Sequence, residues 1–130
     1  MCLADIVMTE TSPAVASIVD FAKTAPEVSV SSPSADRLLA GTPRQKTSNV
    51  FSDAGGKFFA GVWESTPGKW RVSYSENEFC HVTAGRIRIT DQAGDGREFG
   101  AGDTFVVPAG FEGTWEVLEA ARKLYVIYEP

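Results

Sequence analysis

The chain has 130 residues, 43% of them hydrophobic, which is enough for the core of one domain. Its formal net charge of −5 and pI near 4.8 argue against nucleic acid or an anionic membrane as the main partner. No stretch approaches the ~18 apolar residues of a transmembrane helix, and residues 1–6 lack the parts of a secretory signal, so we expect a soluble, cytoplasmic protein.

The first 45 residues differ in composition from the rest, with an excess of Ser, Pro and Ala between 24 and 35. Ser12 followed by Pro13 predicts the start of a short helix. A second helical turn is predicted over residues 34–41, between a serine cap and a glycine stop. We expect residues 1–45 to be an irregular N-terminal segment, partly ordered or forming an interface, and residues 46–130 to be the main domain.

From residue 51 onward the pattern is typical of short strands separated by turns. Residues 69–74 alternate aromatic or apolar side chains with polar ones, which is the period of a strand, and the Asp and Gly residues of 91–96 predict a hairpin turn. The predicted strands are 57–63, 69–74, 79–82, 86–90, 104–107, 114–118 and 123–128. This number of short strands predicts an all-β sandwich or barrel.

Two spacings within these strands narrow the fold. Glu78 is followed after six residues by Gly85, and Gly102 is followed after five residues by Pro108 and then by Gly110. Both spacings resemble the two signature motifs of the cupins. This resemblance implies a cupin jelly-roll, or double-stranded β-helix, barrel over residues 46–130.

The metal-binding histidines of those motifs are absent. Arg71 and Ser73, or their neighbours in a shorter spacing, occupy the two histidine positions of the first motif, and Gly113 occupies that of the second. The one histidine of the chain, His81, lies three residues after Glu78 and therefore on the opposite face of a strand. We expect no transition-metal site and no cofactor.

Glu78 is the leading candidate for chemistry. The motif spacing points it into the barrel, where it would be an acid, a base or an anchor for a ligand; the alternative is a surface residue at the start of a strand. Cys80 shares the inward face and belongs to the predicted ligand-binding set. A nucleophilic thiol would need a neighbouring base, and the one histidine faces the other way, so the alternative is a small buried hydrophobic residue.

Three more residues complete the predicted ligand-binding set. Trp115 lies two residues after Gly113 and, with Tyr74, would form aromatic walls at the barrel mouth, although aromatic side chains on strands usually belong to the core. Lys123 would be a counter-charge for Glu78 or for an anionic ligand, or else a solvated strand end. We expect Glu78 and Trp115 to line one cavity.

Residues 61–85 and 102–125 further resemble the small single-domain cupins of the ureidoglycine-aminohydrolase type and the ethanolamine-utilisation type. The resemblance spans about residues 41–128. It implies either manganese-dependent hydrolysis of ureidoglycine or an acetate-kinase-like role in ethanolamine metabolism. The hydrolase needs histidine ligands that this chain lacks, and no Gly-rich phosphate loop supports kinase chemistry.

The function that we predict is metal-independent binding of a small metabolite or sugar-like molecule. The alternatives are an enzyme, either a metal-free isomerase or lyase using Glu78 or a ureidoglycine-aminohydrolase-like hydrolase, and a regulatory sensor subunit. Phe79 and His81 would point outward and need a cover. We therefore expect a two-fold homodimer in which residues before about 50 contribute to the interface.

Overall fold

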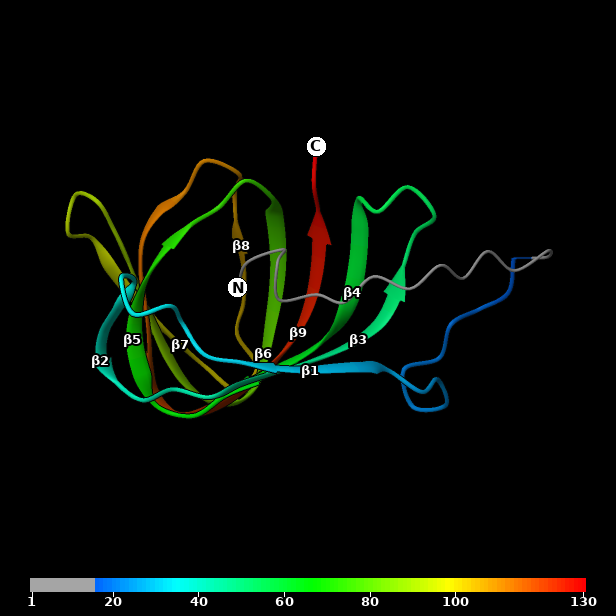
Figure 1. The fold of residues 1–130 in the computed structure, drawn as a ribbon, viewed down its shortest axis with the longest axis horizontal. Helices are drawn as coiled ribbons and strands as arrows, with labels where there is room; N and C mark the ends of the chain where they lie inside the picture. Colours follow the sequence, from blue (N-terminus) through cyan, green and yellow to red (C-terminus); the bar gives the residue numbers. More distant parts are fainter. Residues whose placement is uncertain (1–15) are drawn as a thin grey trace.

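The computed structural model describes residues 16–130, which form nine β-strands and no α-helix (Figure 1). Two strands are much longer than the others, β6 with 15 residues and β9 with 17. The strands are β1 (Glu27–Ser31), β2 (Leu38–Gly41), β3 (Gln45–Ser52), β4 (Phe58–Ser65), β5 (Gly68–Ser73), β6 (Asn77–Asp91), β7 (Gly96–Gly100), β8 (Thr104–Val107) and β9 (Glu112–Tyr128). The predicted all-β barrel is confirmed, and the described chain offers no helix that could cross a membrane.

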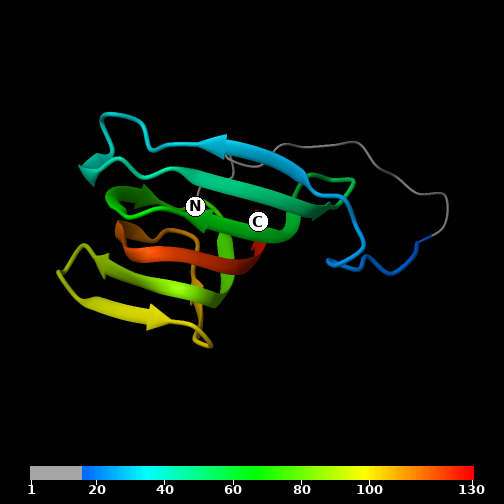
Figure 2. The same ribbon diagram turned by 90° about the horizontal axis from the view of Figure 1, so that it is seen from below.

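The antiparallel pair β6 and β9 forms the centre of the fold, and the two strands pair from Asn77 opposite Tyr128 to Asp91 opposite Gly113. The first half of β6 and the second half of β9 belong to the strand order β8-β6-β9-β4-β3-β1. Their other halves belong to the order β7-β6-β9-β5-β2. Figure 2 shows β1, β3 and β4 lying next to one another in the first of these two sheet halves.

The two halves meet where the β6–β9 pair bends. The register of β6 against β9 shifts between Val82 and Ile87, and Gly85 lies there with φ of +80°. A Cβ atom at Gly85 would lie 2.1 Å from the carbonyl oxygen of Ala120 on β9. Glycine is therefore required at position 85 for two reasons: the backbone is left-handed there, and the facing strand leaves no room for a side chain.

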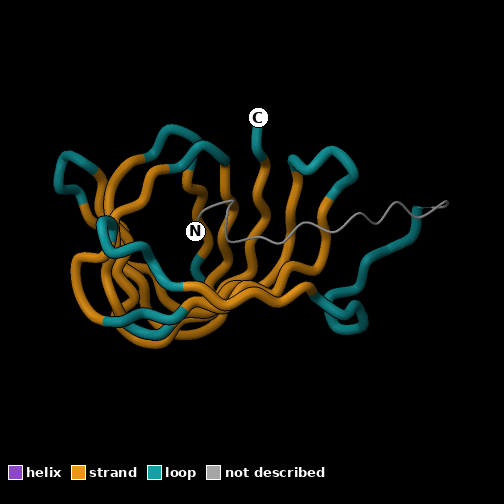
Figure 3. The backbone as a smooth tube through the Cα atoms, in the orientation of Figure 1, coloured by secondary structure: helices purple, strands orange, loops and turns teal. Residues whose placement is uncertain are grey.

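The bend also explains two errors in the predicted strands. Residues 79–82 and 86–90 belong to one strand, and so do 114–118 and 123–128, because each long strand passes through the bend without leaving the ladder (Figure 3). The hairpin turn at 91–96 is confirmed: the side chain of Asp91 accepts hydrogen bonds from the amides of Ala93 and Asp95.

The helical predictions for the first part of the chain are wrong where the structure describes it. Leu38–Gly41 is strand β2, which pairs with β5, and only a turn precedes it. Residues 16–24 contain a turn and no helix, while the proposed cap at Ser12 lies outside the described residues. Strands β1 and β2, both before residue 46, pair with β3 and β5. The division of the chain at residue 45 stays a prediction.

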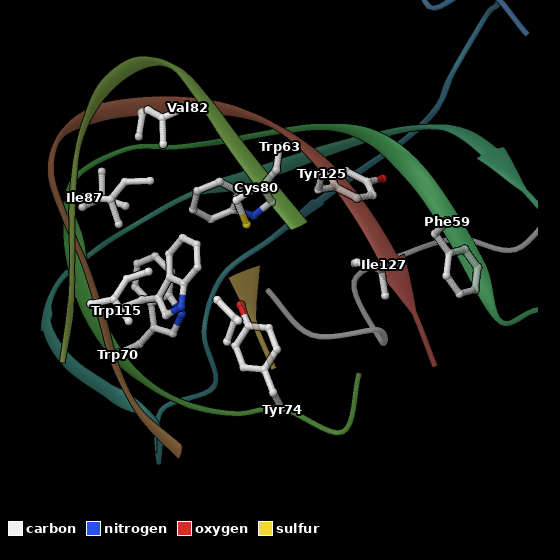
Figure 4. Packing of buried hydrophobic residues seen from close by; sticks show 14 residues of the cluster. Phe59, Trp63, Trp70, Tyr74, Cys80, Val82, Ile87, Trp115, Tyr125 and Ile127 are labelled. Carbon is white, nitrogen blue, oxygen red and sulfur yellow. The ribbon is translucent and has the colours of Figure 1, made fainter. Parts of the chain in front are cut away.

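The core fills the space between the sheet halves (Figure 4). Strand alternation sends one side chain in two inward, so that Trp70 is buried and Arg71 is exposed on β5. Large aromatic side chains dominate, and Trp63 packs edge-on against Trp115 with ring centroids 5.6 Å apart. Tyr74 points its hydroxyl group into this cluster. The buried side chains of Glu78 and Lys123 contact these aromatic residues.

Replacing Gly85 with Ala should destabilise the fold by about 2 kcal/mol or more, because the new methyl group meets backbone that cannot move aside. Gly94→Ala is the matched control, since Gly94 has a similar φ of +87° but no atom lies within 4 Å of the point that its Cβ would occupy. Denaturant midpoints of both variants measure the difference. Equal losses would contradict the close approach at the bend.

Candidate functional site

A lysine and a glutamate form an ion pair inside the barrel. The Nζ atom of Lys123 on β9 lies 2.7 Å from Oε2 of Glu78 on β6, and both side chains are fully buried. Lys123 stands opposite Val82 in the register, so its stem runs along β6 past Cys80 to reach Glu78. Inward-pointing alternation on both strands brings the two groups together.

Further hydrogen bonds surround the pair. The hydroxyl of Tyr74, just beyond the end of β5, donates to Oε1 of Glu78 over 2.8 Å, so each carboxylate oxygen has a donor. The Nζ atom of Lys123 also donates to the sulfur of Cys80 at 3.4 Å. The amide of Tyr74 donates to the carbonyl of Phe111, which fixes the backbone that presents the hydroxyl.

Two indole rings enclose the ammonium group. The Nζ atom of Lys123 lies 4.3 Å from the ring centre of Trp115 and 4.9 Å from that of Trp63. Aromatic faces attract a cation, most strongly where water is excluded. The ammonium group of Lys123 is therefore stabilised both by the carboxylate of Glu78 and by the aromatic faces of the two tryptophans.

The five residues predicted as site residues thus lie in one connected cluster: Tyr74, Glu78, Cys80, Trp115 and Lys123. The predicted pairing of Lys123 with Glu78 is present. The structure differs from the expected open barrel mouth, because Glu78 and Trp115 are fully buried and do not line an open cavity. Trp63, which is outside the predicted set, is a further direct partner of the lysine.

The electrostatics of the pair favour its charged form. Burial alone would raise the pKa of Glu78, but the Lys123 ammonium and the hydrogen bonds from Lys123 and Tyr74 outweigh it and hold that pKa below its usual value. Burial would lower the pKa of Lys123, but the Cys80 sulfur and the Glu78 carboxylate raise it. Glu78 is therefore a carboxylate at neutral pH, suited to act as a base or an anchor.

Cys80 and Tyr74 are held neutral in the same cluster. Burial, reinforced by the charge of Glu78, raises the pKa of the Cys80 thiol to about 12. Burial and the same carboxylate raise the pKa of Tyr74 well above its usual value. A thiol with so high a pKa is a poor nucleophile, so the geometry gives Cys80 the role of a packing and hydrogen-bonding group.

The two tryptophans carry unused hydrogen-bond donors. Within residues 16–130, neither the indole N–H of Trp63 nor that of Trp115 has a hydrogen-bond acceptor, and both nitrogens are buried. Buried indole N–H groups usually find a partner. These donors are available to an oxygen atom of a ligand or a water molecule.

A second acid lies close to the pair. Glu76 is buried, its Oε2 accepts a hydrogen bond from Ser75, and its Oε1 has no partner among the described residues. Burial, with the nearby negative charges of Glu78 and Glu129, raises the pKa of Glu76.

An aromatic-lined cleft opens next to the cluster. It has a volume of about 240 Å³, and its lining includes Phe99, Phe105 and Phe111, with Arg97 and two aspartates. Phe105 packs against Trp115 and Phe111 packs against Tyr74, each with ring centroids 6.2 Å apart. The ring of Trp115 therefore lies between Phe105 in the cleft wall and Lys123, and the ring of Tyr74 lies between Phe111 and Glu78. Sequence reasoning missed these phenylalanines because they lie on three separate segments that only the fold brings together.

Metal ligands do not gather in this region. Across residues 16–130, no three His, Cys, Asp or Glu side chains come close enough to hold an ion together. His81 lies on the other face of β6 from Glu78 and is partly exposed. Beside Glu78, the ammonium of Lys123 takes the position that a cation would need.

The sequence and fold have relatives. Residues 52–125 match the profile of the EutQ-like cupin domain. No curated protein matches the sequence significantly.

Among solved structures, a protein of unknown function of the DUF861 family from Pseudomonas syringae is similar with a TM-score of 0.71 and 24% identity, over 78% of this chain and 44% of that one. The EutQ protein of Clostridium difficile is similar with a TM-score of 0.61 and 20% identity, over 67% of this chain and 64% of that one. A putative ethanolamine utilization protein from Salmonella typhimurium has a TM-score of 0.60 and 14% identity, over 82% and 98% of the two chains. The chain therefore spans less than two thirds of the first two proteins, and these likenesses support the fold alone.

Replacing Lys123 with Met should cost about 3–5 kcal/mol of unfolding free energy, because it leaves the Glu78 carboxylate buried and unpaired. Adding Glu78→Gln to this variant should restore part of the loss. In the wild type, ionised Glu78 stabilises the folded state because its pKa is lower there than in the unfolded chain. This contribution to the unfolding free energy is fully present above the usual glutamate pKa and is lost as the pH falls through the folded-state pKa. Urea unfolding of both single variants and the double variant, at several pH values, measures the coupling. Strictly additive losses would contradict a working ion pair.

Glu76→Gln should make the fold more stable at neutral pH. Because the pKa of Glu76 is raised, the folded state holds its proton more tightly than the unfolded chain, so wild-type stability falls as the pH rises from the usual glutamate pKa through the folded-state value. The variant should lack that part of the pH dependence. Thermal melts between acid and neutral pH test this, and Glu119→Gln, at an exposed position of β9, is the control.

Proposed function

Because the chain belongs to the EutQ-like cupin domain family, we propose that it binds a small polar metabolite or sugar-like molecule inside this barrel, in the cytoplasm and without a metal ion. The observation that carries the proposal is the fully buried Lys123–Glu78 pair with Tyr74 as its third member. Well-packed apolar side chains would stabilise a core at least as well as such a pair. Ionised groups held in a dry interior are a common sign of a functional site.

The cleft supplies the route to this pair. Its phenylalanine walls suit the apolar face of a small ring, and Arg97, Asp91 and Asp95 at the same cleft suit polar substituents. A shift of Phe111 would expose Tyr74, and a shift of Phe105 would expose Trp115. On entering, the ligand would replace its hydrogen bonds to water with hydrogen bonds to the polar groups of the barrel.

The polar groups favour a ligand with both acceptors and donors. The indole N–H groups of Trp63 and Trp115, which have no acceptor among residues 16–130, and the ammonium of Lys123 would bind carbonyl, hydroxyl or carboxylate oxygens. The Glu78 carboxylate would accept hydrogen bonds from ligand O–H or N–H groups. Hydroxy acids, sugars and ureido compounds have this combination.

An enzyme is the second candidate, and one observation favours a particular kind. Glu78 is ionised at neutral pH and can therefore accept a proton from the ligand, as the base of a metal-free isomerase or lyase does, while its lowered pKa makes it a weak base. The ammonium of Lys123 would stabilise the negative charge that develops.

A ureidoglycine-aminohydrolase-like reaction fits the residues poorly. Manganese prefers carboxylate, imidazole and water ligands, whereas the groups around Glu78 are a lysine, a tyrosine hydroxyl and a neutral thiol. The Nζ atom of Lys123 lies within ion-pair distance of the carboxylate that the metal would need.

Binding can be tested with defined probes. Glucose, glycolate and allantoin, each at millimolar concentration with EDTA present, represent the three ligand classes, and melting temperature and tryptophan fluorescence report binding. We expect one class to raise the melting temperature, as a ligand specific for the folded state must. Trp115→Phe and Tyr74→Phe should each weaken binding about tenfold, the loss expected for one hydrogen bond to a charged or buried group.

Trp70→Phe is the matched control, because Trp70 is buried in the same core while the cation–π partners of Lys123 in the described chain are Trp63 and Trp115. It should bind as the wild type does. A stabilising effect that appears only when manganese replaces EDTA, or one that is lost equally in all three variants, would contradict the proposal.

A further inference from the structure

The hydroxyl group of Ser75 stands between two carboxyl groups. Its Oγ atom lies 3.1 Å from Oε2 of Glu76 and 3.0 Å from Oε2 of Glu129. Ser75 and Glu76 belong to the connection between β5 and β6, and Glu129 directly follows β9. Glu76 is buried, whereas Ser75 is exposed and Glu129 is partly exposed. The hydroxyl group therefore connects a buried acid with an acid at the surface.

The number of hydrogen atoms at this bridge requires that one of the two acids is protonated. A serine hydroxyl has one hydrogen and can donate it to one carboxylate at a time. Both contacts of Ser75 are hydrogen bonds only if one acid carries a proton and donates it to Oγ. With both acids ionised, one of the two contacts would set the lone pairs of two oxygen atoms against each other. The geometry thus places one proton on the pair formed by Glu76 and Glu129.

Burial decides which of the two acids holds this proton. Glu76 is 1% exposed, and its Oε1 has no hydrogen-bond partner among the described residues. No Lys, Arg or His of residues 16–130 lies within ion-pair distance of Glu76 or Glu129, and the negative charge of Glu78 acts on Glu76. Solvent can stabilise a charge on Glu129 but not one on Glu76. The proton therefore resides on Glu76, in agreement with the raised pKa of that residue.

Glu76 and Glu78 are neighbouring acids in opposite states. Buried positions alternate from Tyr74 through Glu76 and Glu78 to Cys80, which places Glu76 on the side of the chain that carries the buried ion pair. Lys123 and Tyr74 donate hydrogen bonds that hold Glu78 as a carboxylate, whereas Glu76 has no cation beside it. Two carboxyl groups whose environments separate their protonation states supply the acid and the base of several enzymes.

We propose that Glu76 is a proton donor inside the barrel and that Ser75 and Glu129 form the relay that returns its proton from the surface. When a ligand atom takes the proton, the O–H bond of Glu76 breaks and leaves a carboxylate. The hydroxyl proton of Ser75 then moves to Oε2 of Glu76, and Oγ of Ser75 takes a proton from Glu129. Glu129 receives its proton from water, so the net change is one proton passed from water to the ligand.

The donor and the base together select a class of ligand. They suit a molecule that loses a proton at one atom and gains one at a neighbouring atom, such as a small 2-hydroxy carbonyl compound. This use rests on the proposed function in its enzymatic form, a metal-free isomerase or lyase. The proton on Glu76 and its relay are properties of the protein without a ligand, and they are tested without one.

Infrared difference spectroscopy of the full chain at a pH of about 6, well above the usual glutamate pKa of about 4.3, tests the donor. We expect the carbonyl band of one protonated carboxyl group in the wild type and its loss in Glu76→Gln. Ser75→Ala should shift this band, because the proton of Glu76 loses its acceptor. It should also slow the replacement of the proton by deuterium in heavy water at least about tenfold, since exchange then needs local opening of the chain.

Glu119→Gln and Ser73→Ala are the matched controls. Glu119 is an exposed acid on β9, and Oγ of Ser73 contacts a single carboxylate, that of Glu112 at 3.4 Å, so both variants should keep the band and its exchange rate. Far-UV circular dichroism verifies that each variant keeps its strands. If Glu76→Gln does not fold, the shift and the exchange rate in Ser75→Ala decide the outcome.

Three results overturn the proposal: a wild type without the band, a band that Glu76→Gln retains, and a Ser75→Ala variant in which band and exchange rate are unchanged. A failure of the proposed function has a different signature. In that case no ligand class raises the melting temperature, while the band and its exchange behave as expected.

Discussion

The placement of one ammonium group inside an aromatic barrel constrains the rest of the interior. Lys123 is fully buried, so its charge must be compensated by protein groups, and three kinds are present: the carboxylate of Glu78, the sulfur of Cys80 and the faces of two indole rings. Tyr74 then satisfies the second oxygen of Glu78. The charge of each member thus depends on its neighbours, which is why the pKa of Glu78 is lowered while those of Cys80 and Tyr74 are raised in the same small volume.

The barrel makes this arrangement geometrically possible. Glu78 and Lys123 lie on the two long strands that belong to both halves of the sheet, so their relative position is fixed by an antiparallel ladder on either side of the bend. The bend itself depends on Gly85, since no other residue type tolerates both its backbone conformation and the nearness of Ala120. The same ladder places Phe79 and its neighbours on the outer face. One register therefore determines both the buried pair and the residues exposed on the opposite face of the same strands.

Sequence reasoning predicted much of this, and its failures have physical causes. The motif spacing around Glu78 and the period of two were enough to predict that Glu78, Cys80 and Trp115 point inward. They could not decide whether Lys123 pairs with Glu78 or ends in solvent, because that depends on the register of β6 against β9. Strand β3 was missed because its inward residues, Gln45, Thr47 and Asn49, are polar and yet buried, the opposite of the pattern that identifies a strand. Asn49 accepts a hydrogen bond from Tyr125 inside the barrel, a partner from a distant strand that no local pattern shows.

The central claim is that Glu78 is an ionised partner of Lys123 in the metal-free protein. The most direct test is the titration of the side-chain carboxyl carbon of Glu78 by ¹³C NMR, in EDTA, with Glu78→Gln used to assign the signal. We expect a midpoint below the usual glutamate pKa of about 4.3, and a signal that manganese does not broaden. A midpoint above the usual value, or broadening of this signal by stoichiometric manganese, would contradict the claim.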